Sequence, residues 1–440
     1  MPAVGHVRGD RFLEDNLKEN PDLAVWDGEL YLEMHRGTFT TKGELKRRNR
    51  ELEIRLRDAE LMAAFAALRG FEYPLAELTE AWKLVLINQF HDILPGTHIA
   101  PVTRDAMADY ARAGTVADRV FSEAAAYMGL SGRGEATTHG SLVLLNTLTW
   151  SRKGPVFLEG EFTEGPDFAE VQFQAGICSG KTGGWINVSE IPPLGTVVGK
   201  NGSATAAESS WHTFADGVME TPFYRAVFNE DGSFSSLFDK KNKREIVAPG
   251  GALNRLAVFH DYPGKYDAWD ILPNWQDRED AVVVTTPLEI TSAGPVFAEL
   301  TVGFRVNESA WQQRIRFFRD ASRIEFDHTV DWHERNRLAK AMFDFNLLAR
   351  SATCDTSAGS IQRSTHRNTT WEQARFEVCH HKWADISEGG YGVSIMNDGK
   401  YGISFTENQA GVSLLRGSVR PDPYADKGKH SFCLALQPHT

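Results

Sequence analysis

Hydrophobic residues recur at helical spacing in the first third of the chain and at strand spacing in the rest. Three long segments carry an apolar stripe between polar positions, which predicts helices over residues 42–68, 74–90 and 101–128. Short connections make successive helices antiparallel, so a three-helix bundle is expected over residues 42–130. The dense Arg and Glu of the first helix indicate mainly a solvated face.

Residues 1–41 contain no complete domain by the same pattern. A short helix is expected over residues 12–17. Leu30, Leu32 and Met34 then alternate with polar or amphipathic neighbours, which predicts a strand with one apolar face over residues 29–40. This strand has no local partner, so residues 1–41 are interpreted as the end of a domain that lies upstream.

Beyond Gly129 the helical periodicity stops and short β-rich runs follow, separated by Gly, Pro and Asn turns. Linkers are expected at residues 131–134 and 201–210. A small β-sandwich is expected over 136–200 and a large C-terminal β-sandwich over 211–440. Strands are predicted at residues 142–145, 155–158, 171–173, 185–188, 223–228, 282–286, 297–304, 313–318, 323–330 and 392–396. The expected fold class is therefore multidomain α+β, a three-helix bundle followed by antiparallel β-sandwich domains.

The composition of the 440 residues excludes several classes of protein. No apolar run is long enough to span a membrane, and residues 1–20 contain no apolar stretch like a signal peptide, so no membrane partner and a cytoplasmic location are expected. The net charge of −12, from 59 acidic and 47 basic residues, argues against a nucleic-acid partner. The cysteines lack the paired spacing of a disulfide framework or a cysteine-based zinc site; they are Cys178, Cys354, Cys379 and Cys433.

The first candidate for chemistry is the stretch 88–97, in which the apolar helical pattern ends on His91 and Asp92. Pro95 and Gly96 prevent the helix from continuing, so the pair is expected at an element end, where side chains can point into a cleft. Such a pair forms either a structural hydrogen bond or part of a metal site. Walker-type, dinucleotide-binding and serine-hydrolase motifs are missing from the sequence, which disfavours those functions.

Polar and aromatic residues also cluster at three places, residues 266–270, 331–334 and 365–371. Acidic and amide groups can bind adjacent hydroxyls while an indole stacks on a sugar ring, so these clusters are compatible with carbohydrate binding. The alternative for each cluster is loop anchoring or hydrogen bonding in the core.

In combination and in this order, these segments resemble the middle and C-terminal portion of glycoside hydrolase family 38, the retaining α-mannosidases. Residues 29–41 are similar to the family segment Glu-Leu-Tyr-Leu-Glu-x-His-x-Gly-Thr-x-Thr-Thr, and residues 88–96 to Asn-Gln-Phe-His-Asp-(Ile/Val)-x-x-Gly. Later landmarks follow in sequence at residues 146–150, 231–240, 267–270, 332–334, 371–377 and 414–416, and residues 397–402 and 422–426 resemble the cytosolic and bacterial branch. The resemblance implies that the β region is a mutarotase-like supersandwich.

The resemblance also implies roles for individual residues. The family histidine in the motif at 88–96 is a ligand of the catalytic zinc, and the aspartate after it touches substrate hydroxyls. His91 is therefore expected to bind Zn²⁺, with Co²⁺ as the alternative metal, and Asp92 to bind an α-mannoside or oligosaccharide substrate. His35, Arg36 and Arg416 are expected in the wall of the substrate pocket.

The chain departs from the family pattern before residue 29. Family enzymes carry a preceding α/β domain with a His-x-Asp motif, the nucleophilic aspartate and the acid/base carboxylate, whereas about 28 residues without His-x-Asp stand here. Residues 438–440 likewise resemble a place where the family continues. The chain is therefore interpreted as a fragment of a retaining α-mannosidase that has no catalytic nucleophile of its own and is inactive alone.

Two other interpretations stay open beside it. The chain could be a non-catalytic carbohydrate-binding or assembly module derived from the same family. A β-sandwich lyase or phosphorylase explains the motif around His91 less well. The sequence leaves open whether the chain forms a homo-oligomer, which linkage it prefers and which of the two metals it binds.

Overall fold

The structure is a computed structural model that describes residues 4–31, 33–130, 142–162, 172–199 and 211–440. The predicted linkers at 131–134 and 201–210 lie outside the described residues. The chain divides into two compact units, Met1–Glu33 and Met34–Thr440. The first unit contains helix α1 (Gly9–Glu19), which confirms the helix expected over residues 12–17.

The prediction of a strand over residues 29–40 is wrong for the residues of this range that the structure describes, which are all except Leu32. Glu33 and Met34 form a turn, with Met34 at a φ of 66°, and Arg36–Phe39 form the short 3-10 helix η1. The backbone N–H of Gly37 donates to the carbonyl of Trp269 over 2.9 Å, and that of Thr41 donates to Gly37 itself. Backbone groups that bond within a turn and to a distant loop cannot join a sheet ladder, so the alternating pattern did not produce a strand.

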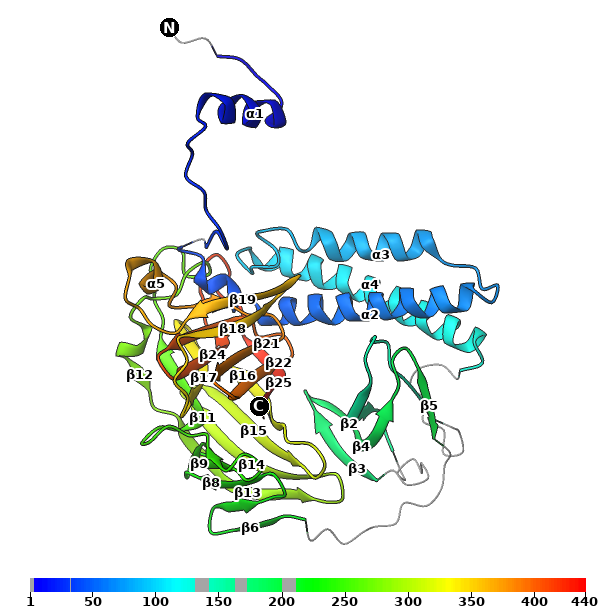
Figure 1. Cartoon of the computed structure of the whole chain (residues 1–440), viewed down its shortest axis with the longest axis vertical. Coiled ribbons are helices and arrows are strands. Elements are labelled where there is room, and N and C mark those ends of the chain that lie inside the picture. Colours follow the sequence, from blue (N-terminus) through cyan, green and yellow to red (C-terminus); the bar gives the residue numbers. More distant parts are fainter. Residues whose placement is uncertain (1–3, 32, 131–141, 163–171, 200–210) are drawn as a thin grey trace. The chain divides into compact units, whose positions relative to one another are not determined.

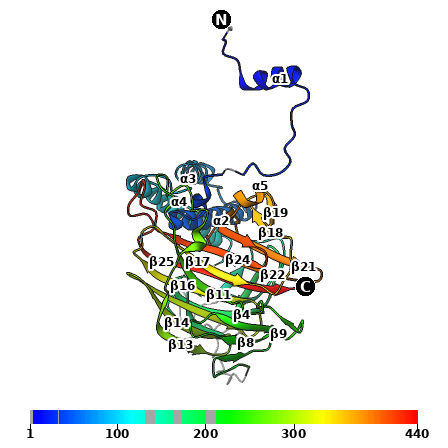
Figure 2. The same ribbon diagram turned by 90° about the vertical axis from the view of Figure 1, so that its left-hand side faces the viewer.

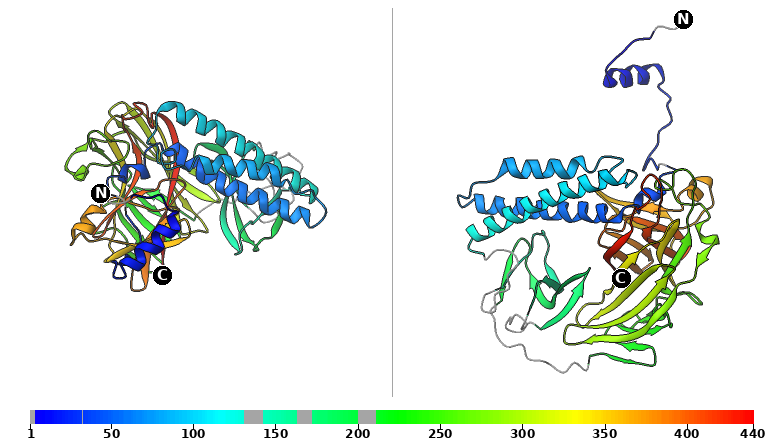
Figure 3. Two further views of the ribbon diagram at one scale, coloured as in Figure 1. Left: turned by 90° about the horizontal axis from the view of Figure 1, so that it is seen from above. Right: turned by 180° about the vertical axis from the view of Figure 1, so that it is seen from behind.

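The three predicted long helices are confirmed as α2 (Gly43–Ala67), α3 (Leu75–Ile87) and α4 (Ala100–Tyr127). They run side by side in Figures 1 and 3. Their shared core is made of buried Leu, Ala, Val and Met side chains with one tyrosine, among them Leu52, Leu56, Val85, Tyr110 and Val120. Burial of this apolar stripe, rather than helix propensity alone, stabilises the bundle.

The polar side of α2 is less solvated than its charge pattern indicates, because Lys46 and Arg50 are buried. Arg50 donates to the carbonyl of Asn397 over 3.0 Å and to the hydroxyl of Tyr401 over 3.2 Å. The carboxylate of Asp426 accepts the backbone N–H groups of Lys42 and Gly43 at the start of the helix. One face of α2 therefore packs against the C-terminal β region, which the helical periodicity of the segment cannot reveal.

Two small sheets follow the helices. Strand β1 (Leu142–Leu145) pairs with β5 (Thr196–Gly199). Strands β2 (Arg152–Glu159), β4 (Lys181–Ile191) and β3 (Phe173–Cys178) form an antiparallel sheet in that order. Ile186, Val188 and Ile191 form its buried core.

The residues from 211 onward form two large antiparallel sheets. One has the order β20-β23-β24-β17-β11-β9-β8-β7-β6, with β10 and β12 attached to β9 and β11. Its strands are β6 (Thr213–Ala215), β7 (Val218–Glu220), β8 (Tyr224–Phe228), β9 (Phe234–Asp239), β10 (Arg244–Glu245), β11 (Leu253–His260), β12 (Glu279–Asp280), β17 (Arg337–Asp344), β20 (Val378–Cys379), β23 (Gly402–Thr406) and β24 (Gln409–Arg416).

The other large sheet has the order β13-β14-β15-β16-β25-β22-β21-β18-β19. Its strands are β13 (Val283–Ala293), β14 (Phe297–Val306), β15 (Ser309–Phe318), β16 (Ile324–Trp332), β18 (Ser351–Thr356), β19 (Gly359–Ser364), β21 (Trp383–Glu388), β22 (Tyr391–Asn397) and β25 (Gly428–His439). Two short helices, η2 (Trp275–Asp277) and α5 (Thr370–Ala374), lie in the connections.

The two large sheets pack face to face, as Figures 1 and 2 show. Phe326 of β16 lies with its ring centroid 6.0 Å from that of Phe234 on β9 and 6.2 Å from that of Phe343 on β17. The predicted fold class, a helix bundle followed by antiparallel β-sandwiches, is confirmed. Within the described residues, every helix is too short or too polar to cross a membrane.

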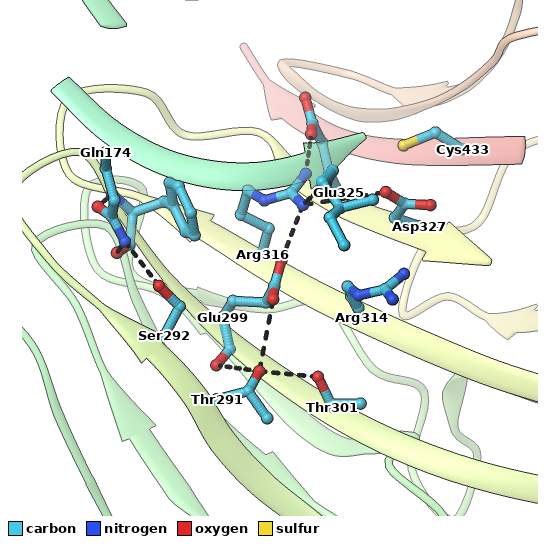
Figure 4. A network of polar contacts seen from close by, with 12 residues as sticks. Gln174, Thr291, Ser292, Glu299, Thr301, Arg314, Arg316, Glu325, Asp327 and Cys433 are labelled. Carbon is cyan, nitrogen blue, oxygen red and sulfur yellow. Dashed lines mark hydrogen bonds and ion pairs between the residues drawn. The ribbon is translucent and has the colours of Figure 1, made fainter. Parts of the chain in front are cut away.

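The small sheet β2-β4-β3 contacts the β13–β16 part of the second large sheet through a buried charge network (Figure 4). Arg316 of β15 is completely buried and donates to Glu299 over 2.8 Å, to Glu325 over 3.0 Å and to the carbonyl of Ile177 over 2.7 Å. Both glutamates stand directly opposite Arg316 in the sheet register. Arg316 thus joins the two glutamates across the strands and also donates from Nη2 to the small sheet.

Two further carboxyl groups complete this network. The side chain of Asp327 accepts the backbone N–H of Ser179 over 3.0 Å, and its guanidinium neighbour, Arg316, lies 3.9 Å away. Burial nevertheless dominates and raises the pKa of Asp327 to about 7. Burial also raises the pKa of Asp398, whose carboxyl accepts from the Ser179 hydroxyl and from the backbone N–H of Cys433. Burial therefore shifts both acids toward their neutral forms.

Candidate functional site

His91 and Asp92 lie on a turn that begins where α3 ends. Helix α3 stops at Ile87, and the N–H groups of Ile93 and Leu94 both donate to the carbonyl of Phe90, which folds the chain back on itself. The side chains of His91 and Asp92 are 77% and 50% exposed, and their Nε2 and Oδ2 atoms are 3.5 Å apart. The expected position at an element end is therefore what the structure has.

Several apolar side chains close to this pair in the sequence are exposed. Leu86, Ile87 and Phe90 at the end of α3 are exposed, together with Ile99 before α4. The apolar stripe that predicted α3 included Leu86 and Phe90, yet its buried member here is Val85. The Phe90 ring lies 4.2 Å from the His91 ring, centroid to centroid. His91 thus lies beside the Phe90 ring and within 3.5 Å of the half-exposed Asp92 carboxylate.

A chain of hydrogen bonds fixes Asp92 from behind. The hydroxyl of Thr97 bonds to the Asp92 carboxylate over 3.2 Å, and Nδ1 of His98 lies 2.9 Å from the Asp92 carbonyl oxygen. Nε2 of His98 lies 3.0 Å from the hydroxyl of Thr103, which also accepts from Lys42 over 2.7 Å. A carbonyl can only accept, so the neutral imidazole donates from Nδ1 and accepts from Thr103 at Nε2. Burial lowers the pKa of His98, which supports the neutral form.

The hydrogen bonds that begin at Asp92 continue through Lys42 into the C-terminal sandwich. The ammonium of Lys42 is 2.9 Å from the carboxylate of Asp422, and both side chains are buried. Burial lowers the pKa of Lys42, while Asp422 opposes that change. The loop that carries Asp422 thereby helps to hold Asp92, although 330 sequence positions separate the two.

The other three candidate residues gather around η1. Arg36 is buried, donates to the carbonyl of Ala374 over 2.9 Å, and lies over the ring of Phe376. Arg416 of β24 is buried and donates to Asp261 over 2.7 Å. His35, half-buried, stands immediately before η1.

Asp270 and Thr41 connect these side chains. Asp270 accepts from Arg36 through its carboxylate over 3.3 Å and from Arg416 through its carbonyl over 2.6 Å. Thr41 accepts from Arg416 at its hydroxyl over 3.0 Å and from Lys46 at its carbonyl over 2.5 Å. The expectation that Arg36, Arg416 and His35 line a substrate pocket stays a prediction.

The three polar and aromatic clusters serve as loop anchors. Asp267 accepts the backbone N–H groups of Val419 and Arg420, and Glu334 accepts from the hydroxyl of Ser309 over 2.7 Å. Thr369 and Glu372 form a reciprocal capping box at the start of α5. These contacts favour the anchoring interpretation for the polar residues, while Tyr266 and Trp371 keep exposed rings.

The donor set is incomplete for a catalytic zinc ion. Three protein ligands are usual at such a site. The described part of the chain contains no group of three or more His, Cys, Asp and Glu side chains that could hold a metal ion. His91 is accessible, so it fits as one donor of a site that requires further ligands.

Sequence reasoning did not identify several residues that hold the turn, above all Thr97, His98 and Lys46, whose ammonium donates to the carbonyls of Leu94 and Pro95. Thr97 is the last residue of the stretch 88–97, and His98 follows it. Their closeness to His91 and Asp92 in the sequence was therefore the signal that could have identified them. Lys46 gave none, because a lysine among many charged residues on a helix is ordinarily solvated.

Two family models match the chain. The description "Alpha mannosidase middle domain" matches residues 33–128, and "Glycosyl hydrolases family 38 C-terminal domain" matches residues 219–424. The first range contains the bundle with the turn of His91, and the second contains most of the large sandwich.

Curated relatives align along nearly the whole chain. Alpha-mannosidase 2C1 of Homo sapiens is 32% identical over 428 residues, which cover 96% of this chain and 39% of the human protein. Alpha-mannosidase G of Dictyostelium discoideum is 29% identical over 476 residues, covering 100% of this chain and 44% of that protein. Alpha-mannosidase of Saccharomyces cerevisiae is 30% identical over 453 residues, covering 98% and 37%. The chain thus spans less than half the length of these relatives.

A similar fold occurs in solved structures. The crystal structure of an alpha-mannosidase from Enterococcus faecalis V583 superimposes with a TM-score of 0.76 at 17% identity, covering 99% of this chain and 59% of that one. Two family models match residues 33–128 and 219–424, and the human relative aligns with 96% of this chain. The chain therefore belongs to glycoside hydrolase family 38, with that family's α-mannosidase middle and C-terminal domains.

Proposed function

We propose that this chain is part of a metal-assisted retaining α-mannosidase, which hydrolyses terminal non-reducing α-D-mannose residues. The observation that carries the proposal is the exposed His91–Asp92 pair, held from behind by Thr97 and His98 in a chain of this family. Exposed groups on a rigidly held turn are suited to meet a ligand, whereas a structural histidine would be enclosed.

In this proposal His91 supplies one nitrogen ligand through its neutral imidazole, and Asp92 binds adjacent hydroxyls of the sugar. Zn²⁺ or Co²⁺ would supply a Lewis acid and a template for those hydroxyls. Hydrolysis with retention further requires a carboxylate nucleophile and an acid/base carboxyl. We assign these two groups, and the missing metal ligands, to parts of the protein outside the 440 residues.

The activity assay follows release of an aryl group from an aryl α-mannoside, with Zn²⁺ or Co²⁺ added. It compares the 440-residue chain with the protein expressed together with the coding sequence that precedes Met1 in its gene. We expect hydrolysis by the longer protein, loss of that activity on His91→Ala, and none by the 440-residue chain. An active longer protein that keeps its activity after His91→Ala contradicts the role of His91. Absence of hydrolysis in both proteins contradicts the α-mannosidase and favours the carbohydrate-binding module.

Zinc binding by the chain itself is measured by titration calorimetry. Removal of an outer-shell partner typically costs about 10- to 100-fold in metal affinity, so loss of the ligand in His91→Ala is expected to cost at least about 10-fold. The matched control is His333→Ala, because His333 is also exposed and lies 3.0 Å from a carboxylate, that of Asp331, outside the candidate site. An equal loss in both variants would mean that the surface histidines bind zinc adventitiously.

A further inference from the structure

The side chain of Lys46 ends in an unusual environment. It is 5% exposed, and its ammonium donates to three backbone carbonyls, those of Thr41 at 2.5 Å, Leu94 at 2.9 Å and Pro95 at 3.1 Å. Throughout the described ranges, no carboxylate lies within ion-pair distance of this nitrogen. Burial lowers the pKa of Lys46 to about 7, although Asp426 opposes the change. The structure thus encloses this nitrogen among three carbonyl oxygens, with Asp426 as a more distant charge.

Such an arrangement is costly, because a buried ammonium without a paired carboxylate loses its hydration. A methionine of similar length would fill the same space without that cost. What methionine cannot do is bind the three carbonyl oxygens and hold together the segments that carry them. The contacts of the ammonium therefore indicate what the lysine contributes.

Two of the three carbonyls belong to the turn that presents His91 and Asp92. Leu94 and Pro95 form its second half, and Gly96 follows with a φ of +86°. A Cβ atom on Gly96 would lie 2.6 Å from the carbonyl oxygen of Thr41, so the turn is pressed against the segment before α2. Lys46 donates to the carbonyl of Thr41 on one side of this close approach and to those of Leu94 and Pro95 on the other.

The turn is consequently held at two places by different means. Thr97 and His98 fix the backbone and carboxylate of Asp92, while Lys46 fixes the carbonyls two and three residues further on. Lys46 contacts neither His91 nor Asp92 directly, so it acts through the backbone.

We propose that Lys46 is a positioning residue, whose ammonium holds the Leu94 and Pro95 carbonyls and so fixes the direction in which the turn presents His91 and Asp92. The consequence for a metal or a sugar rests on the proposed function above. The holding of the turn does not, because it concerns backbone geometry alone.

The test is amide hydrogen exchange of the 440-residue chain, native and Lys46→Met. The reporters are the N–H groups of Ile93, Leu94 and Gly96, which are bonded within the turn. We expect their exchange to rise at least about 10-fold in Lys46→Met, while amides in the bundle core at Leu56 and Val120 change much less. The matched control is Lys400→Met, since Lys400 is equally buried but has the Phe432 ring as its neighbour.

If Lys46→Met does not fold, Lys46→Gln takes its place, because the amide can donate to a carbonyl without a charge; the same rise is expected at a smaller size. A rise of equal size at Leu56 and Val120, a matching rise at the turn in Lys400→Met, or unchanged exchange at the turn would each overturn the proposal. The zinc titration of His91→Ala separates the two proposals. If His91→Ala does not weaken zinc binding while exchange at the turn rises in Lys46→Met, the metal site is rejected and the positioning role of Lys46 remains.

Discussion

Replacing Arg316 with methionine is expected to lower the free energy of unfolding by about 3 to 5 kcal/mol. The guanidinium is completely buried and lies between Glu299 and Glu325, so its loss leaves the buried Glu299 carboxylate without its cation and Glu325 with Arg323 alone. The variant also loses the hydrogen bond to the carbonyl of Ile177 and with it one attachment of the small sheet. Denaturation in urea, followed by tryptophan fluorescence, measures the effect.

Two further variants identify the cause. Arg314→Met removes an arginine from the same strand that is only half-buried and bonds to Gln312 and Thr329, so a loss below about 1 kcal/mol is expected. Adding Glu299→Gln and Glu325→Gln to Arg316→Met is expected to restore part of the lost stability, because a buried amide carries no charge that requires a cation. If this triple variant is no more stable than Arg316→Met, uncompensated charge is not the reason for the loss.

The second large effect depends on pH. Burial raises the pKa of Asp327 from its ordinary 3.8 to about 7, so the folded protein holds this proton between these pH values while the unfolded chain releases it. Stability therefore falls as the pH rises through that range. In Asp327→Asn this loss cannot occur. The variant is expected to match the native protein near pH 4 and to exceed its stability by up to about 4 kcal/mol above pH 7.

Thermal unfolding at a series of pH values between 4 and 8 tests this expectation. Asp216→Asn is the control, because Asp216 is exposed on the turn between β6 and β7, so the gap from the native protein is expected to stay flat. A constant gap for Asp327→Asn across the series, or a gap that shrinks as the pH rises, would show that Asp327 is ionised in the folded protein.

The bundle and the strand-rich region could be predicted because their patterns are local. A stripe such as Leu45, Leu52 and Leu56 is buried wherever the helix packs, and the strands of the large sandwich are long and β-branched or aromatic. The local pattern gave the wrong prediction for the segment before α2. Leu30 and Met34 alternate as in a strand, but a strand also requires a neighbour, which a pattern of side chains cannot supply.

In the candidate site, too, the residues with a local signal could be predicted and those joined by distant contacts could not. His91 and Asp92 could be found because the helical pattern breaks on them and the stretch resembles a family motif. The groups that hold them could not, because the contacts of Lys46 and Lys42 join positions from 42 to 422 that have no relation in sequence. The triad of Arg316 was hidden for the same reason, since three charged residues on separate strands look like solvated positions until the register aligns them.

The position of Asp426, which caps the start of α2, has a consequence for folding during translation. The carboxylate of Asp426 accepts the backbone N–H groups of Lys42 and Gly43 over 2.6 and 2.7 Å, and 383 positions separate Gly43 from Asp426. Ribosomes add about 5 to 20 residues per second, so roughly 20 to 80 seconds pass between the synthesis of the helix and that of its cap. During translation the bundle must therefore rely on its own apolar core, and the first turn of its first helix is completed only when almost all of these 440 residues have been made.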